Sequence, residues 1–385
     1  MKRVLFTADH GAFRASVRDF IANEVVPMYP EWEEQGHPPR EFYRSLGKLG
    51  VLGLWVPEEY GGGGATSYSY AAVLMEEIAA AGVGFGCAIP HSTLILAYLM
   101  AFATEEQKQR WLPGVASGDT LLAIAMTEPG TGSDLANIKT TATLSAEGTH
   151  YVLNGAKTFI SGGSLADLIL VVCRTQPTNS DNRRRGLSLL AVESTSDGFS
   201  VGRKLRKLGL QANDLVELSF DNVLVPMENL LGGDGEAFDY LSHNLAQERL
   251  AIALTATAAA QAAIAFTIDY VKQRTVFGKP LSTMQNTRFS LAECAAEVEA
   301  MVTFTDRALE LFDTGELSPA DAAKAKLFCT ERAGQVIDKC LQLHGGYGYI
   351  TEYPIARLYA DIRVARIYGG TSEIMKLIIS KSLGL

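Results

Sequence analysis

The spacing of the apolar residues changes twice along the chain, and this limits the possible folds more than any other feature. Up to about residue 120, apolar side chains recur at helical spacing, as at Phe13, Val17 and Phe20. From about 121 to 228 the period is two, which is typical of strands, and from 229 the helical period returns almost to the end. The predicted order is all-α, all-β, all-α. A Rossmann enzyme is disfavoured, because its strands and helices alternate.

This order predicts three domains: an N-terminal all-α domain over residues 1–120, a middle β domain over 121–228, and a C-terminal α-helical bundle over 229–385. Most links between the candidate strands are too short for parallel crossovers, so we expect an antiparallel barrel or sandwich. Glu147-Gly148 and Asn154-Gly155 are tight-turn signals. The candidate strands are 121–126, 140–144, 151–153, 157–160, 168–173, 187–192, 199–201 and 216–220.

The predicted helices are long in the C-terminal domain and shorter before it. We expect the polar helix that starts at Thr104 to stop at Pro113-Gly114, because proline removes a backbone donor. The last helix should follow Gly369-Gly370, where two glycines interrupt the pattern. The other apolar helical stretches are 70–81, 92–103, 237–271, 287–314 and 319–342.

The composition is that of an ordinary globular protein of 385 residues, 47% apolar and 20% charged, which excludes disordered and collagen-like chains. The net charge of −9 argues against a nucleic-acid partner. The apolar run 94–103 is too short for a bilayer, so we expect no membrane span. Five single cysteines favour reduced thiols and a cytoplasmic location. No His or Cys group has metal-ligand spacing, so no metal site is expected.

The segment 126–134 (MTEPGTGSD) is the first candidate binding site. It follows a candidate strand and places the hydroxyls of Thr127 and Ser133 beside backbone N–H groups on a glycine-rich turn. Such a turn can hydrogen-bond a planar heterocycle or a phosphate. A plain loop is the alternative interpretation. A GxGxxG fingerprint is not completed, because Leu135 stands where its third glycine belongs.

Glu248 is the most informative single residue. Apolar residues at Leu241, Leu245 and Ile252 form a helical stripe, and Glu248 occupies the slot that the stripe leaves open. A carboxylate on a buried face is costly unless it is paired, and its pKa tends to rise, as suits a general base. The alternative is a structural glutamate paired with an arginine.

Glycine-rich and basic segments complete the candidates. Residues 342–349 (QLHGGYGY) and 366–373 (RIYGGTSE) set glycines among aromatic residues, and glycine lets a backbone approach a ligand closely. Thr371 and Ser372 lie where the last helix begins, so capping is their usual role. The basic runs 183–185 and 203–207 are either solvated surface or contacts for a phosphate-bearing substrate.

Six segments together resemble the acyl-CoA dehydrogenase family over essentially the whole chain. The resemblance implies a helical N-terminal domain, an antiparallel β-barrel domain and a C-terminal four-helix bundle, usually a homotetramer with one FAD per subunit. The segments occur in the family order: PEEYGG (57–62), MTEPGTGSD (126–134), NGAKTFIS (154–161), QRTVFGKPL (273–281), QLHGGYGY (342–349) and YGGTSEIMK (368–376).

The resemblance also implies which residues bind FAD and substrate. Phe159 takes the place of the usual Trp and Ser161 that of the usual Thr beside the flavin ring, while Arg274 and Gln285 resemble residues that hold the cofactor's far end across a subunit interface. The implied FAD contacts are Ile124, Met126, Thr127, Gly132, Ser133, Phe159, Ile160, Ser161, Arg274, Phe277, Gln285, Gln342, Leu343, Gly345, Gly346, Thr371, Ser372 and Glu373. The implied substrate contacts are Ser133, Leu245, Arg249, Tyr368, Gly369 and Gly370.

The catalytic base departs from the commonest pattern of the family. Many members carry it as the Glu of a Tyr-Glu-Gly-Thr motif, and here Gly369 occupies that place. A minority, the long-chain and isovaleryl types, carry it directly before an Arg on the first long C-terminal helix, which corresponds to Glu248-Arg249 in this chain. Glu248 is therefore the expected base and Gly369 a vacated position that still offers its backbone N–H.

The implied reaction is α,β-dehydrogenation of an acyl-CoA thioester to the trans-2-enoyl thioester. Glu248 would abstract the α-proton while the β-hydride passes to flavin N5, and the Gly369 N–H would stabilise the enolate oxygen. The expected partners are the acyl-CoA substrate, an electron-transfer flavoprotein as electron acceptor, and further copies of the chain. The alternatives are an acyl-carrier-protein dehydrogenase or a flavin monooxygenase on the same fold, or a non-catalytic binding protein.

Overall fold

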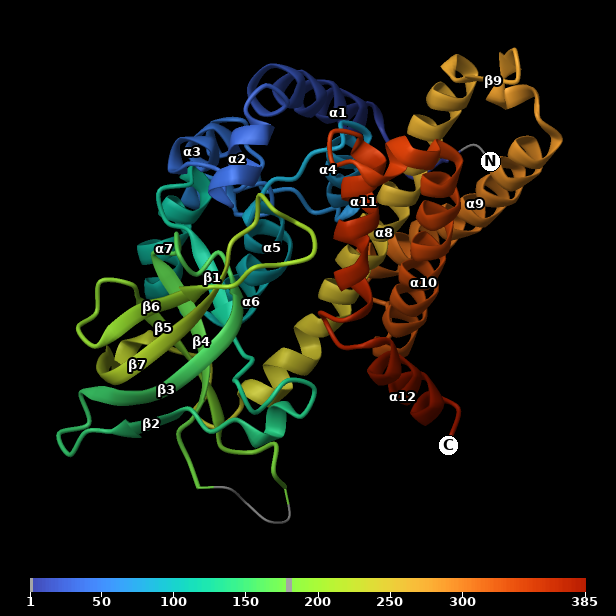
Figure 1. Ribbon diagram of the computed structural model, residues 1–385. Helices are drawn as coiled ribbons and strands as arrows, with labels where there is room; N and C mark the ends of the chain where they lie inside the picture. Colours follow the sequence, from blue (N-terminus) through green and yellow to red (C-terminus); the bar gives the residue numbers. More distant parts are fainter. Residues whose placement is uncertain (1–2, 178–181) are drawn as a thin grey trace.

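Helices, strands and helices follow one another along the chain, in the order that the periodicity predicts. The computed structural model describes residues 3–177 and 182–385. In Figure 1 the first helices lie above the β domain, and the C-terminal bundle stands beside both. The N-terminal helices are α1 (Ala8–Phe20), α2 (Tyr29–Gln35), α3 (Arg40–Lys48), α4 (Ser69–Ala80), α5 (Ala88–Pro90), α6 (Leu96–Phe102) and α7 (Glu105–Ser117), with π-helical turns at Ile21–Val25 and His91–Ile95.

Helix α7 continues past the proline that the sequence predicts as its end. Pro113 lies inside the helix, which ends at Gly118 in the left-handed conformation (φ +81°). Leu112 and Val115 on either side of the proline are fully buried. Their burial keeps the last turn helical although the proline removes one backbone hydrogen bond. The predicted stop is therefore wrong.

The middle domain is one sheet of eight strands in the order β6-β7-β3-β2-β4-β5-β8, with β1 paired to β4. Most neighbours are antiparallel, but β4 has two parallel partners: β1, from Leu122↔Leu168 to Ala125↔Val171, and β2, at Thr141↔Arg174. The expectation of a wholly antiparallel sheet is wrong at these two pairs, because β3 lies between the paired strands in the chain, together with β2 in the first case, and supplies the long connection. The strands are β1 (Leu122–Ala125), β2 (Thr141–Leu144), β3 (His150–Ser161), β4 (Leu168–Arg174), β5 (Leu187–Glu193), β6 (Phe199–Lys204), β7 (Leu215–Pro226) and β8 (Leu230–Leu231).

Strand β3 is continuous where the sequence predicts two strands and a turn. Gly155 lies at an irregularity in the β3–β7 pairing, not in a hairpin. A Cβ there would lie 2.5 Å from Thr140 Oγ1, so this close approach requires a glycine. The predicted turn at Gly148 is confirmed, since its N–H donates to Ser145 O between β2 and β3. The strand thus runs unbroken to Ser161.

Strands β4 and β5 are buried on both faces and join the β domain to the helices. On β4, Leu168 and Leu170 pack with α6 and α7, whereas Ile169 and Val171 pack toward β3 and β7. Side chains alternate across a strand, so one strand supplies both cores. Because β1 pairs with β4, the C-terminal end of β1 is held close to the helical part of the chain.

The C-terminal part is a bundle in which α8 packs against α9, α10, α11 and α4. Its buried core is rich in alanine and includes the thiols of Cys294, Cys329 and Cys340. All five cysteines are free and buried. The helices are α8 (Ala237–Gln273), α9 (Gln285–Asp313), α10 (Pro319–His344), α11 (Pro354–Ile362), which the sequence analysis missed, and α12 (Ser372–Ser382); β9 (Thr275–Val276) and β10 (Lys279–Pro280) form a hairpin after α8.

Helix α8 contains a longer apolar stretch than the sequence analysis recognised. By length and composition it is the one helix of the described chain that could cross a membrane, and 67% of its apolar window is buried inside the protein. A core helix passes the same test, and α8 lies at the centre of the bundle in Figure 1.

Candidate active site

A buried ion pair shapes the loop that follows β1. Lys157 on β3 is fully buried, and its Nζ lies 3.0 Å from both Glu128 Oε1 and Met126 O. The Glu128 carboxylate also accepts from the backbone N–H groups of Lys139 (2.8 Å) and Thr140 (2.9 Å). Burial alone would raise the pKa of Glu128, but these hydrogen bonds and the Lys157 charge outweigh it and lower the pKa. The ionised carboxylate therefore ties the loop back onto β3.

The loop 126–134, which the Glu128–Lys157 pair holds against β3, leaves an exposed surface beside the end of β3; this surface is called the open edge below. Thr158 donates its backbone N–H to Thr127 O (2.9 Å), so loop and strand meet there. A Cβ at Gly130 or Gly132 would meet no heavy atom within 4 Å. Phe159 has a left-handed backbone (φ +59°), and its side chain is 61% exposed. A strained backbone that carries an exposed aromatic ring is typical of a ligand-binding edge.

The sequence-predicted residues of the flavin-ring region all lie on β1, on the tied loop or at the end of β3. Ile160 differs from the others because its side chain is buried in the β core, so only its backbone is available to a ligand. The residues that the structure brings to this region are Ile124, Met126, Thr127, Gly132, Ser133, Phe159, Ile160 and Ser161.

Glu248 and Gly369 face each other across the start of the bundle. A Cβ on Gly369 would lie 3.3 Å from Glu248 Oε1 and 2.4 Å from Ile252 Cδ1. Gly369 has φ +62° and Gly370 φ +91°, conformations that glycine adopts without strain. No hydrogen bond to the Glu248 carboxylate is found in the described part of the chain. Burial raises its pKa, while the charges of Lys326 and Arg249 lower it in part.

Other polar groups around Glu248 also lack partners. Arg249 is 5% exposed, and within residues 3–177 and 182–385 its Nε has no hydrogen bond. The hydroxyl of Tyr98 on α6 is likewise buried without a partner in the described chain. Burial and the Glu248 charge raise the pKa of Tyr98, and the Arg249 charge lowers it in part. Buried polar groups normally find partners, so these unpartnered groups leave hydrogen-bonding capacity beside Glu248 that a bound molecule or water can use. Leu245, one turn earlier on α8, is half-buried beside it.

Lys326 on α10 belongs to the same site, and sequence reasoning missed it. Its side chain is fully buried, and its Nζ donates to Tyr368 O and Gly370 O, the carbonyls on either side of Gly369. Burial lowers its pKa to about 8, against the raising effect of Glu248. A signal was present, because Lys326 interrupts the small apolar residues of α10 as Glu248 interrupts the stripe of α8.

The residues that follow Gly370 start α12 beside this site. Thr371 caps the helix by accepting from Ile374 N, which confirms its predicted capping role. Ser372 is buried and donates to Glu331 Oε1 (2.6 Å). Glu373 is exposed in the first turn, where its own backbone N–H and Thr371 lower its pKa.

The remaining predicted cofactor residues lie at the other end of α8. A groove of about 520 Å³ brings Arg274 together with residues of the QLHGGYGY segment, and the Arg274 guanidinium lies 5.6 Å from the centre of the Tyr347 ring. Phe277 at the tip of the β9–β10 hairpin has φ +48° and is 98% exposed, and Gln285 is exposed at the start of α9. The groove is lined by Tyr270, Arg274, Val276, Leu281, Gln342, Leu343, His344, Gly345, Gly346, Tyr347 and Ile350.

The structure therefore divides the predicted cofactor residues into two groups. Glu248 lies near the start of α8 and Arg274 directly after its end, about 39 Å apart along a helix that rises about 1.5 Å per residue. Figure 1 shows the β9 hairpin at the far end of the bundle from α12. A molecule bound beside Glu248 would have to extend about 39 Å along α8 to reach Arg274 of the same chain.

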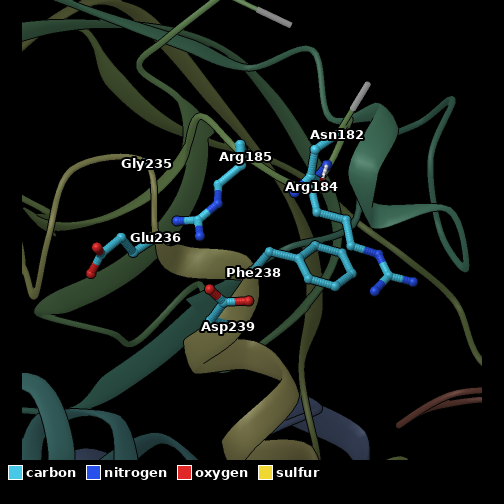
Figure 2. Close-up of a pocket in the computed structure, with 7 residues that line it drawn as sticks. All are labelled: Asn182, Arg184, Arg185, Gly235, Glu236, Phe238 and Asp239. Carbon is cyan, nitrogen blue, oxygen red and sulfur yellow. Dashed lines mark hydrogen bonds between the residues drawn. The ribbon is translucent and has the colours of Figure 1, made fainter. Parts of the chain in front are cut away.

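A second cavity, of about 290 Å³, lies between the β domain and the start of α8. Figure 2 shows the Arg185 side chain directed toward it and the Arg184 guanidinium beside the Phe238 ring, 4.9 Å from the ring centre. Glu236 and Asp239 also line this cavity, but Figure 2 shows the Glu236 carboxylate turned away from the arginines, where it accepts from Tyr240 OH (2.7 Å). The cavity thus offers both charges and one aromatic face to a ligand.

The second basic run does not lie at this cavity. Lys204 donates to Gln35 O near the N-terminal helices. Burial and the charge of Lys204 lower the pKa of Lys207, against the raising effect of the Asp214 and Asp361 carboxylates. Arg203 lies 3.6 Å from Glu217 on the neighbouring strand. The two basic runs therefore lie on separate surfaces, and the run 203–207 is largely exposed, with protein contacts at Arg203 and Lys204.

Three family models match the chain in succession. They describe the N-terminal domain of acyl-CoA dehydrogenase over residues 7–119, its middle domain over 123–223 and its C-terminal domain over 235–384. Within the described residues, no group of His, Cys, Asp and Glu could hold a metal ion.

Similar whole proteins carry related names. The long-chain specific mitochondrial acyl-CoA dehydrogenase of Sus scrofa is 42% identical over 99% of this chain and 88% of its own length. An acyl-CoA dehydrogenase structure from Geobacillus kaustophilus has a TM-score of 0.95 and 45% identity, with 100% of both chains covered. A glutaryl-CoA dehydrogenase from Mycobacterium smegmatis, solved in complex with FADH2, has a TM-score of 0.89 and 30% identity and covers 98% of this chain and 95% of its own.

Proposed function

The chain belongs to the acyl-CoA dehydrogenase family, and on this premise we propose that Glu248 removes the α-proton of an acyl-CoA thioester as the trans-2-enoyl thioester forms. Members of the family are FAD-dependent, and this chain is a flavin-dependent oxidoreductase of acyl-CoA thioesters. The identity of the base and the geometry of the product are the proposal.

The single observation that carries this proposal is the position of the Glu248 carboxylate beside Gly369. The α-hydrogen of a thioester is weakly acidic, so its removal needs a base of raised pKa and a donor for the enolate oxygen. Burial raises the pKa of Glu248, and nothing in the described chain hydrogen-bonds its carboxylate. Gly369 has no side chain to separate that carboxylate from a substrate, and its backbone N–H is the donor.

The residues present fit FAD in two parts. The open edge at Gly130, Gly132 and Phe159 suits a flat ring, and the groove at Arg274 suits a diphosphate, which arginine binds well. When bound, FAD supplies the acceptor for the β-hydride. Because the two parts lie at opposite ends of α8, we propose that a second copy of the chain contributes the Arg274 groove to each site, within a homotetramer.

The cavity at Arg184 and Arg185 supports CoA as the carrier of the acyl group. Its two guanidinium groups suit the phosphates of the CoA nucleotide. The run 203–207 takes no part in this proposal.

We propose that the electrons leave to an electron-transfer flavoprotein and that the enzyme works in the cytoplasm. The second of these proposals rests on five free, buried thiols. Turnover with purified electron-transfer flavoprotein, and the fraction of cell extract that holds the protein, test the two points separately. Activity only with O₂ as acceptor would contradict the first.

The decisive experiment mixes the holoenzyme anaerobically with short, branched, medium and long acyl-CoAs and follows the flavin absorbance. We expect bleaching with at least one chain class, and a loss of about 10²–10⁴-fold in rate for Glu248→Gln. Glu293→Gln is the matched control, because this exposed carboxylate on α9 pairs with Lys339 and belongs to none of the predicted site residues. A wild-type rate of flavin reduction in Glu248→Gln, at unchanged FAD content, would refute the assignment.

A further inference from the structure

Lys326 is a buried cation that the fold itself does not explain. Its side chain is 1% exposed, and within the described residues its hydrogen-bond acceptors are two neutral carbonyls, Tyr368 O and Gly370 O. Within the described residues it forms no ion pair closer than 4 Å. A buried ammonium without an ionic partner is costly, and an apolar side chain of similar length would fill the same space at lower cost.

The acceptors of Lys326 determine the direction of one N–H group. The Tyr368 carbonyl and the Gly369 N–H belong to the same planar peptide, in which C=O and N–H point in opposite directions. Since this carbonyl points at the Lys326 ammonium on α10, the Gly369 N–H points away from α10. The positive φ values of Gly369 and Gly370 give the turn wide backbone freedom, so an external tie is needed to hold one orientation.

The charge of Lys326 also acts on Glu248. It lowers the pKa of this carboxyl against the effect of burial, and Arg249 from α8 acts in the same sense. Arg249 in turn lowers the pKa of Lys326 in addition to burial. The other titratable groups on which the Glu248 charge acts are the hydroxyls of Tyr68, Tyr98 and Tyr368, which come from three further elements. One ammonium therefore contacts the donor turn and biases the base toward its ionised, proton-accepting form.

We propose that Lys326 is a positioning residue for the dehydrogenation, which holds the 368–369 peptide so that the Gly369 N–H meets the thioester oxygen and keeps Glu248 ionised for proton removal. This inference rests on the proposed function. Lys326 touches neither substrate nor flavin in this scheme, and it acts through the turn and through Glu248.

The orientation of the turn can be read from the thioester itself. The probe is an acyl-CoA with a 13C-labelled carbonyl and two methyl groups in place of its α-hydrogens, which can form neither an enolate nor an enoyl product and so keeps its carbonyl band. In the wild-type holoenzyme a hydrogen bond from Gly369 lowers the infrared carbonyl frequency of the bound probe. Lys326→Met should lose most of this lowering, and its rate of flavin reduction with substrate should fall about 10²-fold, mainly in kcat rather than in KM.

A second variant separates the effect of the Lys326 hydrogen bonds to the turn from the effect of its positive charge. Lys326→Gln keeps an N–H donor for the turn but no charge, so the carbonyl frequency should stay near that of the wild type. Without the positive charge the pKa of Glu248 rises further, so the acidic limb of kcat/KM should move to higher pH. Lys326→Arg, which keeps both a donor and a positive charge, should bring the carbonyl frequency and the acidic limb part of the way back to the wild-type values. Thr330→Val is the matched control, because it removes the buried hydrogen bond from Thr330 Oγ1 to the backbone carbonyl of Lys326 and leaves the Lys326 ammonium in place, so it should change neither readout.

The outcomes decide the proposal even if one variant is unstable. Folded Lys326→Met with bound FAD, a wild-type carbonyl frequency and a wild-type acidic limb would overturn it. If Lys326→Met does not fold, an unshifted acidic limb in Lys326→Gln overturns it. Failure of the proposed function looks different, because Glu248→Gln would then reduce flavin normally whatever the Lys326 variants show.

Discussion

Moving the base from α8 to the 368–370 turn tests the geometry of the site most directly. The change combines Glu248→Gln with Gly369→Glu, so that the carboxylate enters the same space from the opposite wall. The two positions are close, since a Cβ on Gly369 would lie 3.3 Å from Glu248 Oε1. The new side chain also meets Ile252 Cδ1 at 2.4 Å, which is closer than any real contact. The double variant alone should therefore stay poorly active.

The cost of the move can be estimated from the structure. A residue other than glycine at φ +62° costs about 1–2 kcal/mol. Replacing Ile252 with Val removes the clashing Cδ1 and costs about 0.5–1.5 kcal/mol of packing. Together this is about 3 kcal/mol, which a folded domain of ordinary stability tolerates. The triple variant Glu248→Gln/Gly369→Glu/Ile252→Val should fold and recover part of the 10²–10⁴-fold loss of the single Glu248→Gln variant.

Anaerobic stopped-flow reduction of the flavin measures this recovery, with FAD content and thermal unfolding recorded for every variant. Ile252→Val alone is the control for packing, and it should keep close to the wild-type rate. The reasoning is refuted if the triple variant is folded and loaded with FAD but no faster than Glu248→Gln. In that case Gly369 and Glu248 do not face the same substrate carbon.

Three further predictions follow from the structure. Arg274→Ala should lower FAD occupancy, measured from the flavin absorbance of the purified protein, more than it lowers the melting temperature of the apo chain. Arg184→Ala should raise KM for an acyl-CoA while leaving KM for the matching acyl-pantetheine unchanged; equal effects on both would contradict a CoA site there. Burial raises the pKa of Asp361 to about 6. The folded state therefore holds a proton that the unfolded state releases near pH 4, so stability should fall as pH rises from about 4 to 6. This fall in melting temperature should be smaller in Asp361→Asn.

The sequence was sufficient where one residue stood out from a regular pattern. Glu248 was found because it fills a gap in an apolar stripe, and burial in the structure has the expected effect on its pKa. Lys326 has the same signature on α10, but a lysine among alanines is usually assigned to the surface. Its role depends on two carbonyls that lie more than 40 residues away in the chain, and periodicity carries no information about them.

The errors in the fold have a similar cause. Asn154-Gly155 has the composition of a hairpin turn, yet Gly155 is there because Thr140 approaches its backbone. Pro113 should end a helix, yet the burial of Leu112 and Val115 keeps α7 helical. The β1–β4 pair is parallel because β2 and β3 lie between the two strands in the chain. In each case a tertiary contact outweighs a correct local rule.

The length of α8 has a consequence for mixtures of mutant chains. In the proposed assembly each site takes its base from one copy and its Arg274 groove from another, because the two lie about 39 Å apart on α8. Glu248→Gln subunits and Arg274→Ala subunits are then each defective alone. When the two exchange partners, one site of a hybrid pair collects both lesions and the other receives neither. Two inactive preparations that are mixed, dissociated and reassembled should therefore regain activity, in up to half of the sites of each hybrid pair.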